Sequence, residues 1–130
     1  MDIFSTYAVD EAKEQNGTWM ELGDAEFLVA RAGNKAYRKQ LGKTYERNKK
    51  ALETKTDAAD ELSDKIMIDV IADTILFGWK NVSFKGKELE FSKDNAKMLL
   101  GFKDFRTEIM KLAEDFDAFK AEQQAEDLKN

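Results

Sequence analysis

Apolar side chains are densest between residues 58 and 79, where they occur on nearly every face of a helical wheel. Four charged residues of this segment fall at steps of four and form a narrow polar stripe, Glu61, Lys65, Asp69 and Asp73. Steps of four are typical of an α-helix, and a helix that is apolar on most sides is enclosed by the rest of the protein. We therefore predict a long helix over residues 58–79 at the centre of the core.

Two other stretches have the pattern of β-hairpins. The paired runs are residues 18–22 with 26–31, and residues 81–85 with 87–91. A glycine stands in each intervening turn, and short apolar or alternating runs around such a turn are typical of antiparallel strands. Because an isolated hairpin is marginally stable in water, we expect each to lie against the helices.

Three further segments have helical spacing. A basic helix is predicted over about residues 35–53, with one apolar face formed by Tyr37, Leu41, Tyr45 and Leu52. Ser92 is a good N-cap for a helix that continues to residue 100. The last helix is predicted over about residues 102–126, with a seam at steps of three and four formed by Phe102, Phe105, Ile109, Leu112, Phe116 and Phe119.

These elements predict a mainly α fold: a small helical domain of about four helices with one or two short peripheral β-hairpins. A length of 130 residues indicates a single domain over residues 1–130. The chain has no proline, which favours helices because proline disrupts helix interiors. Residues 1–16 allow a short helix around residues 10–15 but show no other clear pattern, and residues 121–130 have no apolar face, so we expect both segments to be largely flexible.

The absence of two residue types excludes several kinds of catalytic and metal-binding site. The chain contains no cysteine and no histidine, which removes disulfides, thiolate nucleophiles, the usual zinc ligands and the commonest general base. We therefore predict a protein that is not an enzyme and has no cofactor and no metal site. Glu114, Asp115 and Asp117 lack the glycine turn of a calcium loop and are interpreted as solvated surface. Without a leader-like segment or a long apolar run, we expect no signal peptide and no membrane partner.

The net charge of −5 hides an asymmetry. Residues 31–55 hold nine basic side chains and two acidic ones, so this window carries +7 and the rest of the chain carries −12. Such a basic helix can be a solvated face, a nucleic-acid contact or a docking surface for an acidic protein surface. Docking on the acidic body of a second copy gives a head-to-tail contact. The candidates for this self-association are Arg38, Lys39, Lys43 and Arg47.

Six aromatic residues are candidates for core positions or for contacts with a partner: Trp79, Phe84, Phe102, Phe105, Phe116 and Phe119. Buried aromatic anchors are common in both settings, and the sequence does not separate them. Phe116 and Phe119 stand at the end of the apolar seam. We expect them to be the most exposed members of the group, because they overhang what the shorter elements can cover.

Three blocks of sequence resemble the tail assembly chaperones of long-tailed, non-contractile (siphovirus-type) bacteriophages. They are LGDAEFLVARAGNKAY at 22–37, KIMIDVIADTILFGWKNVSFKGKELEFSKDNAKMLL at 65–100 and KDFRTEIMKLAEDFDAFKAE at 103–122. The resemblance covers most of the chain. It rests on the order and spacing of the blocks and not on a catalytic signature.

The resemblance implies a non-enzymatic protein that binds the tape measure protein, the long helical chain that sets tail length, and keeps it soluble during tail assembly. It further implies self-association, in some members as head-to-tail spirals, action in the host cytoplasm, and absence from the finished tail. Many such proteins are also made as a longer form by a programmed frameshift, and the resemblance assigns recruitment of the tail tube protein to that form.

Two other interpretations remain open at this point. The first is a small nucleic-acid-associated regulator that uses the basic helix at 31–55, which strong and salt-sensitive DNA binding would support. The second is a structural component of the virion, which would be found in purified particles.

Overall fold

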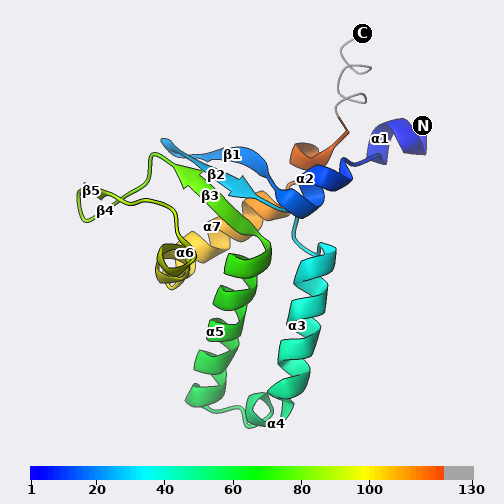
Figure 1. The fold of residues 1–130 in the computed structure, drawn as a ribbon. Helices are drawn as coiled ribbons and strands as arrows, with labels where there is room; N and C mark the ends of the chain where they lie inside the picture. The colour runs from blue at the N-terminus through cyan, green and yellow to red at the C-terminus, as the bar shows by residue number, and fades with distance from the viewer. Residues whose placement is uncertain (122–130) are drawn as a thin grey trace.

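The computed structural model describes residues 1–121 of the chain. Three strands form an antiparallel sheet in the order β1–β2–β3, and two shorter strands form a separate hairpin (Figure 1). The elements in this range are α1 (Ile3–Tyr7), α2 (Glu11–Asn16), β1 (Thr18–Leu22), β2 (Ala25–Val29), α3 (Lys35–Arg47), α4 (Lys49–Leu52), α5 (Asp57–Thr74), β3 (Leu76–Lys80), β4 (Ser83–Phe84), β5 (Lys87–Glu88), α6 (Lys93–Leu100), α7 (Lys103–Ala113) and the 3-10 helix η1 (Phe116–Phe119).

The sheet includes part of what we predicted as the central helix. α5 ends at Thr74, and β3 follows and pairs antiparallel with β2. Leu76, Gly78 and Trp79 are all buried, and a strand that is covered on both faces lacks alternation, so its apolar pattern resembles that of a buried helix. The prediction of a mainly α domain of about four helices with only peripheral hairpins is therefore wrong. The protein is an α/β mix whose sheet contributes to the core.

Asn34 fixes the point at which α5 ends. Its buried side-chain amide donates a hydrogen bond to the carbonyl oxygen of Thr74 at 2.9 Å. Its side-chain oxygen accepts from the backbone N–H of Tyr37 at 2.9 Å and so caps the start of α3. One side chain thus satisfies polar groups at the ends of two helices, which would otherwise be unpaired.

α3 and α5 run side by side and form an arm that extends away from the sheet, with α4 at its tip (Figure 1). Asp73 of α5 accepts a hydrogen bond from the side-chain amide of Gln40 at 2.8 Å and forms an ion pair with Lys93 of α6 at 2.9 Å. Burial alone would raise the pKa of Asp73, but these bonds and the charge of Lys93 hold its pKa below the ordinary value. Asp73 therefore links three helices.

The basic helix is shorter than predicted. α3 ends at Arg47, and the single turn α4 follows after Asn48. The side-chain amide of Asn48 donates to the carbonyl oxygen of Thr44 at 2.8 Å. Such local bonds from asparagine compete with the regular helical hydrogen bonds.

Both predicted hairpins are present. β1 and β2 turn at Gly23-Asp24 as expected, whereas the strands of the second hairpin are shorter than predicted. Lys85 and Gly86 have positive φ angles of 52° and 80°, which suits a two-residue turn. Ser92 caps α6 by accepting from the backbone N–H of Asn95 at 3.0 Å, so the prediction for this helix is confirmed.

The last predicted helix is too long. α7 ends at Ala113, whose carbonyl oxygen accepts from the backbone N–H of Ala32 at 2.9 Å. The Asp115 carboxylate accepts from the backbone N–H of Asp117 at 3.1 Å and begins η1. The prediction of one continuous helix over residues 102–126 is therefore wrong for residues 102–121. The rest of that prediction, and the expected flexibility of residues 122–130, lie outside the described residues.

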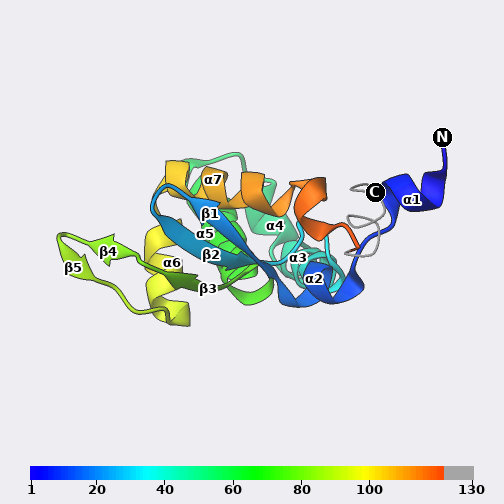
Figure 2. The ribbon, with the colours of Figure 1, turned by 90° about the horizontal axis from the view of Figure 1, so that it is seen from above.

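The N-terminal segment, expected to be largely flexible, contains two short helices, of which α2 agrees with the short helix considered around residues 10–15. Backbone bonds join the N–H of Asp10 to the carbonyl oxygen of Phe119 at 2.8 Å and the N–H of Ala121 to the carbonyl oxygen of Ala8 at 3.3 Å. α2 and η1 are therefore neighbours. α1 extends beyond them at one end of the molecule, and the β4–β5 hairpin lies at the other end (Figures 1 and 2).

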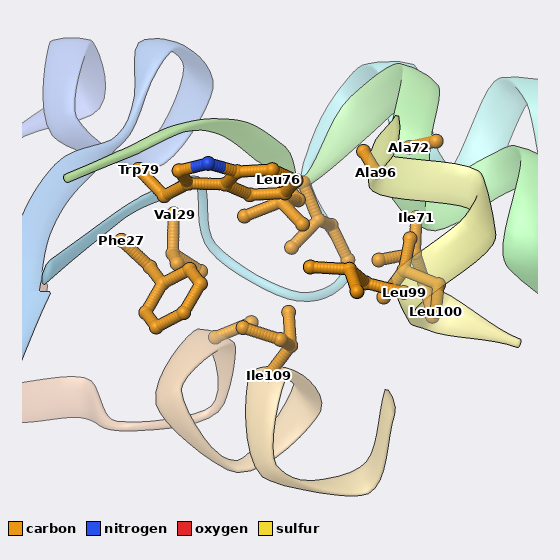
Figure 3. Packing of buried hydrophobic residues seen from close by; sticks show 12 residues of the cluster. Phe27, Val29, Ile71, Ala72, Leu76, Trp79, Ala96, Leu99, Leu100 and Ile109 are labelled. Carbon is orange, nitrogen blue, oxygen red and sulfur yellow. The ribbon is translucent and has the colours of Figure 1, made fainter. Parts of the chain in front are cut away.

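The core is one cluster shared by the sheet and three helices. Side chains of β2 and β3 meet those of α5, α6 and α7 between these elements (Figure 3). The buried members of the cluster are Phe27, Val29, Ile71, Ala72, Ile75, Leu76, Trp79, Ala96, Leu99, Leu100, Ile109 and Ala113.

Candidate functional site

The features of the described surface that suggest a function are patches of charge and of apolar side chains. Within residues 1–121, no three or more acidic side chains gather where they would hold a metal ion. No helix of this range combines the length and the apolar composition needed to cross a membrane. The exposed acidic residues Glu114, Asp115 and Asp117 follow or end α7 and form no such group.

The four predicted self-association residues lie together on α3. Arg38, Lys39, Lys43 and Arg47, here called the basic stripe, are all exposed. On the other side of α3, Gln40 bonds to Asp73 and the Tyr45 hydroxyl lies 3.5 Å from the Ser63 hydroxyl, so that side faces α5.

The charges of the basic stripe are not neutralised by their neighbours. Among the described residues, none of the four cations forms an ion pair, although ion pairs occur on α5, α6 and α7. A shallow hollow lies along the stripe and is lined by Gly42, Lys43, Glu46 and Arg47. Unpaired cations on one helix face can attract an acidic partner over a Debye length of roughly 10 Å.

Reversing part of the basic stripe is expected to weaken self-association. Changing Arg38, Lys39 and Lys43 to glutamate replaces attraction with repulsion at an acidic surface, and we expect an association constant lower by about tenfold or more. The side chains are exposed, so helicity should not change. Sedimentation at several concentrations measures the association, and circular dichroism measures the helicity.

A matched control makes the same change in net charge away from the basic stripe. It replaces Lys85, Lys87 and Lys103 by glutamate. These side chains are also exposed, and the control should leave self-association close to that of the parent. Equal sizes of the stripe variant and the parent at every concentration would contradict the proposed role of the stripe.

Three of the six candidate aromatic residues belong to the interior. The Trp79 indole is buried and donates from Nε1 to the carbonyl oxygen of Leu89 at 2.7 Å. The half-buried Phe105 ring lies 5.6 Å from the ring of Phe27, centroid to centroid. Phe119 is fully buried, so our expectation of its exposure is wrong: its 3-10 turn folds back beside the N-terminal segment.

Phe116 begins the same turn and is half-buried, so it is less exposed than Phe102 and our expectation for it is wrong as well. Its ring centroid lies 5.9 Å from that of Tyr7, 5.5 Å from the guanidinium carbon of Arg31 and 5.4 Å from Lys120 Nζ. Arg31 is itself held by an ion pair with Glu14. Two cations over an aromatic ring favour a fixed position for Phe116.

The structure brings together the other two aromatic candidates. The rings of Phe84 and Phe102 are 6.1 Å apart, which joins the β4–β5 hairpin to the start of α7. Phe102 is 54% exposed, and the exposed Met98 lies four residues before it on α6. We call Phe84, Met98 and Phe102 the end patch. The sequence analysis did not identify Met98 as an exposed residue, because an apolar side chain at its position in an amphipathic helix is typical of the core.

A second exposed apolar group was also missed. Ile3, Phe4 and Tyr7, here called the α1 knob, are all exposed, with Phe4 at 79%. The sequence does contain a sign of this helix. Asp2, a good N-cap residue, precedes Ile3, Phe4 and Tyr7, which are one and three residues apart. Its carboxylate caps α1 by accepting from the backbone N–H of Ser5 at 2.9 Å. The segment is too short for periodicity alone to reveal a helix.

Comparison with known proteins identifies the origin of the chain. Residues 32–130 match the model of one protein family, described as YdaY prophage protein. No curated protein and no solved structure matches the chain. The matched range includes α3 with its basic stripe and the elements that carry the end patch. The protein therefore belongs to the YdaY prophage protein family and is of phage origin.

Proposed function

We propose that this protein is a phage tail assembly chaperone without enzymatic activity. It binds the tape measure protein in the host cytoplasm, keeps that protein soluble during tail assembly, and is absent from the finished tail. The observation that supports this most is an exposed apolar end patch on a strongly charged domain of phage origin. The proposal also draws on the resemblance of residues 22–37, 65–100 and 103–122 to such chaperones.

The end patch is the surface that we assign to the client. A long helical client presents a repeated apolar stripe, and a bound chaperone covers it with exposed apolar side chains. Phe102 and Met98 supply such side chains, and methionine adapts to partners of different shape. Many copies along one client bind through repeated modest contacts. Self-association through the basic stripe holds those copies in a head-to-tail row.

A longer form of the protein completes the proposed pathway. In this proposal, a programmed frameshift adds a domain that recruits the tail tube protein, while the present chain covers the client. No cofactor takes part in either step.

Co-expression with the tape measure protein of the same phage tests the proposal. The soluble fraction of the client should rise several-fold when this protein is present, and the two should co-purify. Replacing both Phe84 and Phe102 by serine should remove most of that gain, because the double change removes the exposed Phe102 ring and the half-buried Phe84 ring beside it. Soluble client is measured by quantitative gel analysis after centrifugation.

The matched control is Trp19→Ser, which removes another exposed aromatic side chain on β1 and should leave the gain intact. Circular dichroism checks that both variants fold. A client that stays insoluble both with this chain and with its frameshifted form would reject the chaperone role.

The competing candidate is a nucleic-acid-associated regulator, and one observation favours it. The basic stripe has no ion-pair partner among the described residues and therefore offers four free cations. However, the chain outside residues 31–55 carries −12 and repels phosphate. Strong DNA binding at moderate ionic strength that the stripe reversal abolishes would favour this candidate.

A further inference from the structure

We infer that the free edge of β1 binds an extended, positively charged peptide segment of another protein, which adds a fourth strand to the sheet. This partner is distinct from the helical client of the end patch, so the contact lies outside the proposed chaperone role. The backbone groups, the side chains and the charges at the edge of β1 each support it.

β1 has backbone groups that no other strand uses. It is the outer strand in the order β1–β2–β3 (Figure 2). The two-residue turn at 23–24 makes Leu22 and Ala25 a hydrogen-bonded pair, and such pairs alternate along an antiparallel ladder. The backbone groups of Met20 and Leu22 therefore face β2, whereas those of Trp19 and Glu21 face outward. Within residues 1–121, these outward groups have no backbone partner.

Unpaired N–H and C=O groups on residues two apart select an extended partner. They match the repeat of another strand, whereas a helix has already paired its own backbone groups. Over residues 18–22, β1 has no proline, no lysine and no bulge in its pairing with β2, so it lacks common features that protect sheet edges. The opposite edge differs, because the segment at Leu89 lies beside β3 and accepts a hydrogen bond from the Trp79 indole.

Trp19 provides an apolar contact surface beside this edge. Met20 packs against the core cluster, and alternation along the strand places Trp19 and Glu21 on the other face of the sheet. Trp19 is 42% exposed and lies opposite Leu28 of β2. Its ring extends across to β3, since a Cβ added at Gly78 would lie 3.5 Å from Cη2 of the indole. The ring is thus held against the sheet and leaves part of its surface open to a neighbouring strand.

The charges on the same face favour a cationic partner. Glu21 and Glu26 lie directly opposite each other in the register of β1 and β2, and like charges in such positions are destabilising. Neither carboxylate forms an ion pair within residues 1–121. The Lys80 ammonium, opposite Glu26 on β3, instead lies 4.1 Å from the centroid of the Trp19 ring. A lysine or arginine that a partner strand places opposite Glu21 offsets the repulsion.

These contacts specify a short sequence pattern in the partner. In an antiparallel fourth strand, the residue opposite Glu21 comes two positions before the residue opposite Trp19. The pattern is therefore a basic residue, any residue, and then an apolar or aromatic residue. A second β1 does not fit this pattern, because TWMEL contains an acidic residue and no basic one.

A fluorescently labelled synthetic peptide of sequence TVKTYTK tests the contact. Its lysine is placed opposite Glu21 and its tyrosine opposite Trp19. Fluorescence anisotropy should show saturable binding to the intact protein, and the backbone N–H signals of Trp19 and Glu21 should shift in NMR spectra. N-methylation of the peptide's lysine and tyrosine blocks the hydrogen bonds to β1 and should lower the affinity at least about tenfold. The matched control carries the two methyl groups on the fourth and sixth residues, whose N–H groups face away, and should bind as the unmodified peptide does.

A charge exchange tests the role of Glu21. Glu21→Lys should weaken binding of the peptide at least about threefold, and a peptide with glutamate in place of the third-position lysine should restore it. The variant should remain folded, because the side chain is exposed and the change removes the repulsion from Glu26. Glu53→Lys makes the same charge change on an exposed side chain after α4 and should bind as the parent does.

Several results would overturn the inference. These are no saturable binding of the peptide, equal effects of the two methylated peptides, or an unchanged affinity in Glu21→Lys. Trp19→Ser should lose peptide binding and still keep the client soluble; loss of both would place the client on β1 and contradict a separate partner. The peptide assay contains no client, so a client that stays insoluble rejects the chaperone role alone.

Discussion

Replacing Ile71 by aspartate is expected to leave the chain without a cooperative folded state at neutral pH. Ile71 is fully buried on α5, in the cluster shared with β2, β3, α6 and α7. Losing a buried isoleucine side chain costs about 2–5 kcal/mol, and burying a carboxylate without a partner costs several more. A domain has a free energy of unfolding of only about 5–15 kcal/mol in total. Thermal melting followed by circular dichroism measures the result.

Two controls separate the effect of the charge from other effects of the substitution. Ile71→Val keeps the site apolar and should cost only about 0.5–1.5 kcal/mol. Ile3→Asp places the same charge on an exposed side chain of α1 and should change the unfolding free energy by no more than about 0.5 kcal/mol. Melts are compared at a dilution where the chain is monomeric. A cooperative melt of Ile71→Asp close to that of the parent would show that the core has been misplaced.

The sequence predicted the elements that depend on local signals. Ser92 caps α6, and Gly23-Asp24 forms the turn of the first hairpin, because each of these signals acts within a few residues. β3 escaped prediction for a different reason. Its apolar residues continue the run of α5, and only pairing with β2, which is about fifty residues away in sequence, decides between helix and strand.

The prediction for the last helix also failed because contacts distant in sequence decide the structure there. Spacings of three and four from Phe102 to Phe119 suggested one continuous helix. The chain instead leaves the helix after Ala113, where tertiary bonds to residues 32, 10 and 8 hold the backbone. The buried position of Phe119 depends on these distant contacts, which no local pattern in the last segment reports.

The candidate surfaces were partly predictable. The basic stripe follows from charge spacing on one helix, and the structure places its members together on an exposed face of α3. The pairing of Phe84 with Phe102 depends on how the β4–β5 hairpin meets α7, so the sequence named both residues without joining them. A hollow lined by residues of α5 and α7 depends on how the two helices pack, and no local pattern indicates it.

Replacing Trp79 by alanine is expected to destabilise the domain by about 3–5 kcal/mol. The indole is buried, its ring centroid lies 4.9 Å from that of Phe91 and 6.3 Å from that of Phe27, and both pairs meet edge to face. Its N–H donates to the carbonyl oxygen of Leu89, which ties β3 to the segment that leads into α6. Urea denaturation followed by circular dichroism gives the change in the free energy of unfolding.

Trp79→Phe separates the hydrogen bond from the packing. It keeps an aromatic ring between Phe27 and Phe91 but leaves the Leu89 carbonyl oxygen without its donor, which costs about 1–3 kcal/mol. The order of stability should therefore be parent, then Trp79→Phe, then Trp79→Ala, with client solubility lost only as far as folding is lost. The opposite pattern, a Trp79→Ala chain with the parent's urea midpoint and no soluble client, would make Trp79 a contact residue. Because the indole is fixed on three sides by groups of its own chain, we expect stability to change first.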